Sequence, residues 1–217
     1  MKRRTFLQSG TFAAASLMVG RSAIAEIFSP KKVTPPIGLQ LYTMGNLMIS
    51  DIKGTLEKLA AIGFKEMESA GSQKGNFYGY QPKELAKMIK VAGMNWRSAH
   101  VAGAPFTMEQ VMKMAKTAED SARIQKMMDS FKNRPKTPNL KDNYQELAND
   151  AAEGGISYLV CSSIPVNTLD EIKTAVEVFN KSGEACKKVG VQFAYHNHTT
   201  EFDYVEGHRP FDYILSN

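Results

Sequence analysis

The chain has 217 residues, of which 43% are hydrophobic and 23% are charged, a composition typical of a globular protein. Its formal net charge is +5, but the first 25 residues carry four basic side chains and no acidic one, which leaves +1 for the rest. The remainder therefore lacks the basic excess with which nucleic-acid-binding proteins attract phosphates, and we expect no nucleic-acid partner.

The first 25 residues are typical of a twin-arginine export signal. Arg3 and Arg4 precede a weakly hydrophobic stretch, and an A-x-A cleavage site ends at Ala25. The apolar run has about a dozen residues, whereas a membrane-spanning helix needs about 20, so we expect no stable membrane anchor. The pattern predicts recognition by the twin-arginine export machinery, cleavage near Ala25 and a periplasmic location.

Residues 26–36 are predicted to be a linker because they contain three prolines, which discourage regular structure. After them, a pattern of helix, glycine and short apolar run recurs. The glycines that end these helices are expected to be left-handed, and they are Gly63, Gly93, Gly155 and Gly190. Together with an opening apolar run, the pattern predicts five buried strands, at residues 37–42, 65–69, 94–100, 156–161 and 191–196.

The segments between the strands have helical patterns. Thr168 and Glu171 form a capping-box motif ahead of an apolar stripe, and Pro82 suits a first helical position. Residues 107–153 hold no strand-like run, and we expect helices there, interrupted at the prolines of NRPKTPNL. The alternation predicts an α/β fold with parallel strands. Both a doubly wound sheet and a (β/α)8 barrel fit the pattern.

Polar side chains recur where the predicted strands end. Parallel α/β proteins bind ligands at the carboxyl ends of their strands, and polar groups buried there without a partner would cost free energy. We therefore expect a shared pocket at these ends, formed by Gln40, Tyr42, Glu68, His100, Ser162, Ser163, His196 and His198.

The stretch VQFAYHNHTTEF, residues 191–202, is the most informative strand end. Strand alternation places His196 and His198 on one side and Asn197 on the other, and Glu201 follows. Imidazole and carboxylate groups together suit Zn, Mn, Fe or Co, so one interpretation is a metal site. In the alternative, one histidine binds substrate hydroxyls and Glu201 caps the next loop.

Four stretches, IGLQLYT, GFKEMESAG, RSAHV and YHNHTTEF, resemble motifs of the sugar phosphate isomerase/epimerase family, which has a xylose isomerase-like TIM barrel. The resemblance runs over residues 37–217. It implies a (β/α)8 barrel, of which only about the first five strand–helix units are present, because a whole barrel takes ~250 residues. We therefore expect residues 37–217 to be a partial barrel in a C-terminally truncated chain.

The resemblance implies a metal-dependent sugar isomerase or epimerase that transfers a proton next to a carbonyl. No phosphate-cradling glycine loop is recognisable, which favours a free or oxidised (keto) sugar as the small-molecule partner. His196 would bind a divalent metal (Mn, Co, Zn or Mg), with the remaining ligands expected beyond residue 217. Glu201 and His198 are the expected catalytic residues, and the expected substrate-binding residues are Gln40, Tyr42, Glu68 and His100.

Two alternatives use the same residues. One is a lyase, hydratase or glycoside-cleaving enzyme that acts on a 3-keto sugar, and the other is a non-catalytic sugar-binding fragment. Product analysis separates the isomerase or epimerase from the first alternative, because an isomerase conserves the mass of its substrate. Metal binding without turnover would favour the binding fragment.

Overall fold

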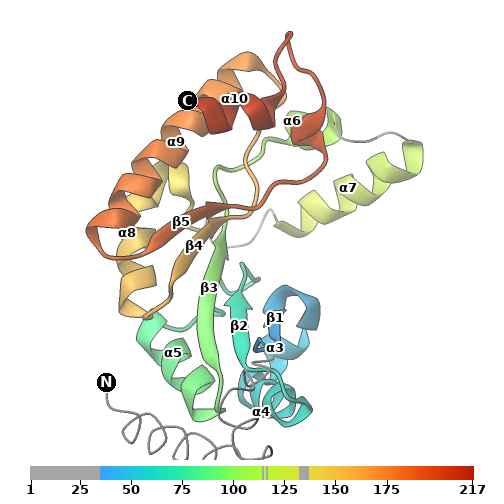
Figure 1. Cartoon of the computed structure of the whole chain (residues 1–217). Coiled ribbons are helices and arrows are strands. Elements are labelled where there is room, and N and C mark those ends of the chain that lie inside the picture. Colours follow the sequence, from blue (N-terminus) through green and yellow to red (C-terminus); the bar gives the residue numbers. More distant parts are fainter. Residues whose placement is uncertain (1–34, 114, 116, 132–136) are drawn as a thin grey trace, which may run out of the picture. The chain divides into compact units, whose positions relative to one another are not determined.

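Five short strands form one parallel sheet in the computed structural model, which describes residues 35–113, 115, 117–131 and 137–217 (Figure 1). The predicted export signal and most of the predicted linker lie outside these residues. One compact unit begins at Pro36 and continues to Asn217. Its strands are β1 (Gly38–Gln40), β2 (Glu66–Ser69), β3 (Asn95–Val101), β4 (Tyr158–Cys161) and β5 (Gln192–Tyr195).

The strands lie in chain order, β1-β2-β3-β4-β5, and each neighbouring pair is parallel. A doubly wound sheet reverses its strand order at a switch point, whereas a (β/α)8 barrel keeps its strands in sequence. The observed order therefore separates the two folds that the sequence pattern left open. The described unit has the topology of the first five strands of a barrel.

Four helices each directly precede a strand of the sheet: α4 (Ile52–Ile62), α5 (Pro82–Val91), α8 (Leu140–Glu153) and α9 (Leu169–Lys188). Helices α5, α8 and α9 contact β3, β4 and β5 respectively, and α4 packs against α5 (Figure 1). The other described helices are η1 (Leu41–Met44), α3 (Leu47–Ser50), α6 (Met108–Lys113), α7 (Ala118–Phe131), η2 (Thr200–Phe202) and α10 (Pro210–Ser216).

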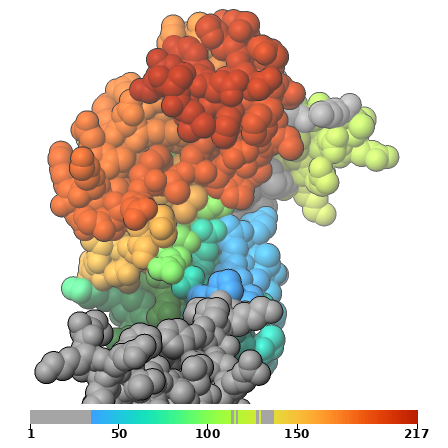
Figure 2. Space-filling view, in the orientation of Figure 1, coloured from blue at the N-terminus to red at the C-terminus, as the bar shows by residue number. Residues whose placement is uncertain are grey.

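Helix α10 packs against α9, and the two form a continuous part of the surface, orange to red in Figure 2. Residues 108–113, 118–131 and 140–153 are helical, as the sequence predicts for this region. Among the described residues, no helix combines the length and the hydropathy that crossing a membrane requires.

One face of the sheet forms the core with the helices. Side chains alternate between the two faces of a strand, and those on the helix side are almost completely buried: Met67, Ala99, Val101 and Leu159 are each at most 1% exposed. Burying a side chain the size of leucine or valine contributes about 1.5–3 kcal/mol. This core fixes the sheet and leaves the opposite face for polar side chains.

The four glycines predicted to end helices do adopt left-handed backbone conformations. Their φ angles are +116° at Gly63, +82° at Gly93, +67° at Gly155 and +76° at Gly190. Such angles cost conformational free energy in an L-residue with a side chain, whereas glycine adopts them without strain. The turns that lead into β2, β3, β4 and β5 are therefore explained by residue type alone.

The predicted first strand, 37–42, is wrong at its carboxyl end. The strand β1 stops at Gln40, and the chain turns into η1. The hydroxyl of Thr43 donates to the carbonyl of Gln40, and the N–H of Gly45 donates to the carbonyl of Tyr42. These local hydrogen bonds close a turn, and Gly45 permits it because its φ is +51°. Tyr42 is consequently 72% exposed.

Candidate functional site

Side chains from four strands meet at the carboxyl ends of the sheet. The amide nitrogen of Gln40 lies 2.7 Å from Glu68 Oε1 and 3.0 Å from His100 Nδ1. The His100 and His196 ring centroids are 4.6 Å apart, and those of His196 and His198 are 4.9 Å apart. We call these five residues the strand-end cluster. Residues separated by up to 158 positions in the sequence are thus brought side by side.

A serine that the sequence analysis did not single out joins the cluster. The Ser98 hydroxyl donates to Glu68 Oε2 at 2.6 Å, and Ser98 is 7% exposed. Ser98 lies two residues before His100, so strand alternation could have placed both on one face. The carboxylate of Glu68 therefore accepts one hydrogen bond on each oxygen, from Gln40 and from Ser98.

A bulge in β3 makes this arrangement possible. The register shifts between Met67 and Glu68, so that Glu68 pairs with Ser98 and Arg97 is the extra residue. The Arg97 guanidinium contacts the Glu66 carboxylate at 3.0 Å. Consecutive residues of a regular strand point to opposite faces, yet residues 97 and 98 each bind a carboxylate of β2 here. The bulge lets one strand provide partners for two neighbouring acids.

His100 is the most buried histidine of the cluster, 8% exposed. Burial lowers its pKa, nearby Glu68 raises it, and His196 and His198 lower it, so that the pKa lies below its usual value. His100 is therefore a neutral imidazole at neutral pH. Its Nε2 atom is buried without a hydrogen-bond partner among the described residues, 3.9 Å from Glu68 Oε1.

Glu201 lies in η2, and three donors hold its carboxylate. Its carboxylate accepts the Tyr195 hydroxyl at 2.7 Å, the His198 backbone N–H at 3.0 Å and the Thr200 hydroxyl at 3.1 Å. Burial alone would raise the pKa of Glu201, which is 3% exposed, but these hydrogen bonds lower it below the usual value. Glu201 is therefore ionised, and it ties the loop after β5 to the strand.

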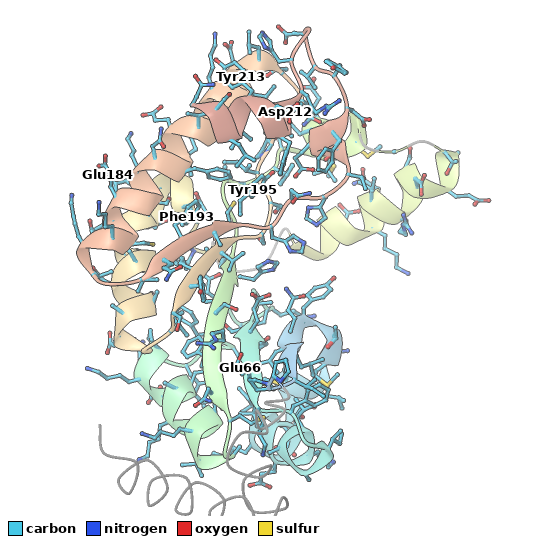
Figure 3. All side chains as sticks on the ribbon, in the orientation of Figure 1. Glu66, Glu184, Phe193, Tyr195, Asp212 and Tyr213 are labelled. Carbon is cyan, nitrogen blue, oxygen red and sulfur yellow. The ribbon has the colours of Figure 1, made fainter. Side chains whose placement is uncertain are left out.

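Tyr195 is a second residue that the sequence analysis did not single out. It leaves β5 on the side of α9 (Figure 3), and its ring centroid lies 4.7 Å from that of Phe179. This packing positions the hydroxyl that donates to Glu201. The signal in the sequence is weak, because Tyr195 alternates with His196 and belongs to the opposite, helix-covered face.

The remaining predicted positions lie outside the strand-end cluster. Tyr42 is exposed in η1 and makes no hydrogen bond to the cluster in the described part of the chain. The backbone of Ser162 donates to the Val101 carbonyl at 2.7 Å, and the Ser163 carbonyl accepts from Gly103 at 2.8 Å. These two serines thus extend the contact between β3 and β4 through their backbone.

The chemistry of His196 suits a divalent metal, because it is an exposed imidazole beside a second exposed imidazole, His198. However, the described residues contain no group of three or more His, Cys, Asp or Glu side chains arranged to hold a metal ion. The Glu201 carboxylate already accepts hydrogen bonds from three donors. The described chain can therefore contribute a nitrogen ligand but not a complete ligand set.

No protein-family model and no curated protein matches the chain. Two solved structures of sugar phosphate isomerase/epimerases from Parabacteroides distasonis ATCC 8503 are similar to it. One is 25% identical with a TM-score of 0.60, over 86% of this chain and 63% of its own. The other is 24% identical with a TM-score of 0.60, over 83% of this chain and 64% of its own.

The chain therefore spans less than two thirds of the length of these two relatives. The similarity confirms the predicted fold class: a parallel α/β sheet that corresponds to part of a xylose isomerase-like TIM barrel.

Proposed function

We propose that the chain is part of a metal-dependent sugar isomerase or epimerase that acts on a free or oxidised (keto) sugar. The supporting observation is the strand-end cluster, a polar set drawn from four strands. It lies on a fold shared with solved sugar phosphate isomerase/epimerases. Such a reaction needs hydrogen-bond donors for sugar oxygens and a base that takes the proton beside the carbonyl.

In this proposal His196 holds the divalent metal, which when bound would polarise the sugar carbonyl. His196 and His198 are both exposed, so a sugar can reach their rings. His198 is kept in place by its backbone N–H, which donates to Glu201. His198 binds a hydroxyl of the sugar and passes protons to and from it.

Two carboxylates of the cluster region can serve as the base. Both carboxylates accept hydrogen bonds on each oxygen, but Glu201, the residue expected from the sequence, is only 3% exposed. The side chain of Glu68 is 25% exposed, and it lies directly beside His100. A base must come within hydrogen-bond distance of the proton that it removes. Accessibility therefore favours Glu68 for the transfer, with Glu201 keeping the loop and His198 in place.

The test is solvent exchange at the reacting carbon. The full chain is incubated in D₂O with a panel of ketoses and 3-keto sugars, together with Mn²⁺, Co²⁺, Zn²⁺ or Mg²⁺, and followed by proton NMR and mass spectrometry. We expect deuterium at the carbon next to the carbonyl and an isomeric product. Glu68→Gln should abolish the exchange, whereas Glu66→Gln, two residues away on the same strand, should preserve it.

Other outcomes identify the alternatives. A product that has lost or gained water, or a cleaved glycoside, would indicate the lyase, hydratase or glycosidase. Sugar binding without exchange or product, across the whole panel, would indicate a binding fragment and overturn the proposed enzyme. If Glu201→Gln rather than Glu68→Gln stops the exchange, Glu201 is the base.

We also propose that residues 1–25 are a twin-arginine export signal, that 26–36 are a linker and that the protein works in the periplasm. The support is the Arg3–Arg4 pair and the A-x-A site that ends at Ala25. Replacing both arginines with lysine should keep the uncleaved protein in the cytoplasm. Cell fractionation and the mass of the chain test this, and unchanged export of the variant would contradict it.

A further inference from the structure

The amide of Gln40 stands between an acid and a histidine. Its nitrogen has two N–H donors and cannot accept a hydrogen bond. One N–H donates to Glu68 Oε1 at 2.7 Å, and the other faces His100 Nδ1 at 3.0 Å. Nδ1 must therefore be the accepting nitrogen. In a neutral imidazole one nitrogen accepts and the other carries the proton, so the proton of His100 lies on Nε2.

The orientation of the amide is itself fixed. The Glu68 carboxylate can only accept, so the opposite orientation would bring the Gln40 carbonyl oxygen against a carboxylate oxygen. Glu68 is held on its other oxygen by the Ser98 hydroxyl at 2.6 Å. Hydrogen bonds thus run from Ser98 to Glu68, and from Gln40 to both Glu68 and His100.

This leaves the Nε2–H of His100 as a buried donor without a partner among the described residues. Such a group costs free energy until an acceptor reaches it. A metal ion needs a nitrogen lone pair, whereas an N–H group needs an oxygen. We infer that Gln40 is a positioning residue that fixes the Nε2–H tautomer of His100, so that His100 donates to a sugar oxygen and does not bind the metal.

The substrate part of this inference rests on the proposed function. Because His100 Nε2 is buried, a neighbouring side chain has to move before a sugar oxygen can reach it. The ring of His196 is one such neighbour: it lies edge-on to His100, with the ring centroids 4.6 Å apart, and belongs to an exposed side chain just after β5. Rotations of exposed side chains take picoseconds to nanoseconds. Such a rotation would let a sugar oxygen reach His100 Nε2.

The tautomer is directly measurable. The full chain is labelled with ¹⁵N-histidine, and long-range ¹H–¹⁵N spectra are recorded at a pH at which the rings are neutral. The signals that disappear in His100→Asn identify His100. We expect its proton on Nε2. A predominant Nδ1–H form would overturn the inference without any variant having to fold.

Substitutions of Gln40 test its role. Gln40→Met removes the donor, and the ratio of Nε2–H to Nδ1–H forms should fall about fivefold or more, as expected for the loss of one hydrogen bond. Gln40→Glu replaces the donor with an acceptor and should reverse the ratio. The matched control is Gln192→Met, an exposed glutamine in β5, which should leave the ratio unchanged. An unaltered ratio in both Gln40 variants would remove its positioning role.

Two probes test what His100 binds. Zn²⁺ should shift the ring signals of His196 and leave the proton on His100 Nε2. Coordination of Zn²⁺ by His100 Nε2 would overturn the claim that it is not a ligand. A ketose that undergoes exchange in the assay above should shift the His100 Nε2–H proton, and no shift would remove the substrate contact. A fixed tautomer in a chain without turnover would refute the proposed function but keep the role of Gln40.

Discussion

In the folded protein, the Glu201 carboxylate accepts hydrogen bonds from three protein donors instead of from water. Its ionisation is therefore linked to the stability of the fold. Its pKa is lowered by hydrogen bonds from Tyr195, the His198 backbone and Thr200, which outweigh the opposing effect of burial. A group whose folded pKa is lower than its unfolded pKa stabilises the fold when it is ionised. That contribution is complete above the usual carboxyl pKa and is lost as the pH falls through the lowered folded value.

We therefore expect the free energy of unfolding to fall as the pH drops below about 4.5, the ordinary glutamate value. In Glu201→Gln, which cannot titrate, this acid-side slope should be shallower. Urea unfolding at a series of pH values measures it. Glu184→Gln, an exposed residue of α9 (Figure 3), is the control and should follow the wild type. Equal slopes in wild type and Glu201→Gln would contradict the prediction.

His196 gives a second prediction for a single side chain. If it supplies a metal ligand, His196→Ala should weaken the binding of Zn²⁺ or Mn²⁺ by about tenfold or more, because a coordinating nitrogen is removed. Isothermal titration calorimetry measures the affinity. His208→Ala is the matched control, since His208 is exposed and its ring contacts Tyr213. Equal metal affinity in both variants would exclude His196 as a ligand.

Individual side chains could be predicted only as far as strand alternation determines them. Alternation and the position of strand ends were enough to bring Gln40, Glu68 and His100 to one place. They could not predict that Ser98 bonds to Glu68, because this depends on the register of β2 against β3, which a bulge shifts. They also could not predict that Glu201 accepts a hydrogen bond from Tyr195, since that contact depends on how the loop after β5 folds back.

Among the elements, the helix-ending glycines were predictable, and the carboxyl end of the first strand was not. Glycine is the residue type that adopts positive φ without strain, so sequence alone carries the signal. The end of β1, in contrast, is set by hydrogen bonds of Thr43 and Gly45 that compete with continued strand pairing. An apolar run such as IGLQLYT contains no sign of that competition.

Two glycines near the end of α9 should respond to alanine in opposite directions. Gly190 has φ +76°, so Gly190→Ala should destabilise the protein by about 1–2 kcal/mol. Gly183 lies inside α9, and an added Cβ would meet nothing within 4 Å. Gly183→Ala should therefore stabilise the protein by about 0.5–1 kcal/mol. Urea unfolding midpoints test both, and two shifts in the same direction would contradict the assignment.

At the scale of the whole folded unit, the sheet is unevenly supported. In the described structure β3 pairs on both sides and is covered by α5, whereas β1 and β5 each pair on one side only. Amides that exchange only by global unfolding lie where pairing and burial are greatest. We expect the slowest hydrogen exchange in β3 and β4 and faster exchange in β1 and β5. Hydrogen exchange read by NMR or mass spectrometry tests this, and equal protection in β1 and β3 would contradict it.

The extra residue in β3 makes the strand tolerant of a change in length. Because Met67 pairs with Trp96 and Glu68 with Ser98, a chain lacking Arg97 would pass from Trp96 to Ser98 in regular register. Such a deletion would not invert the side chains that follow, as it would in a regular strand. Glu66 would lose its guanidinium partner, while Ser98 would still bind Glu68. Deleting this one residue would thus remove the Arg97–Glu66 ion pair and leave the carboxyl end of β3, with His100, intact.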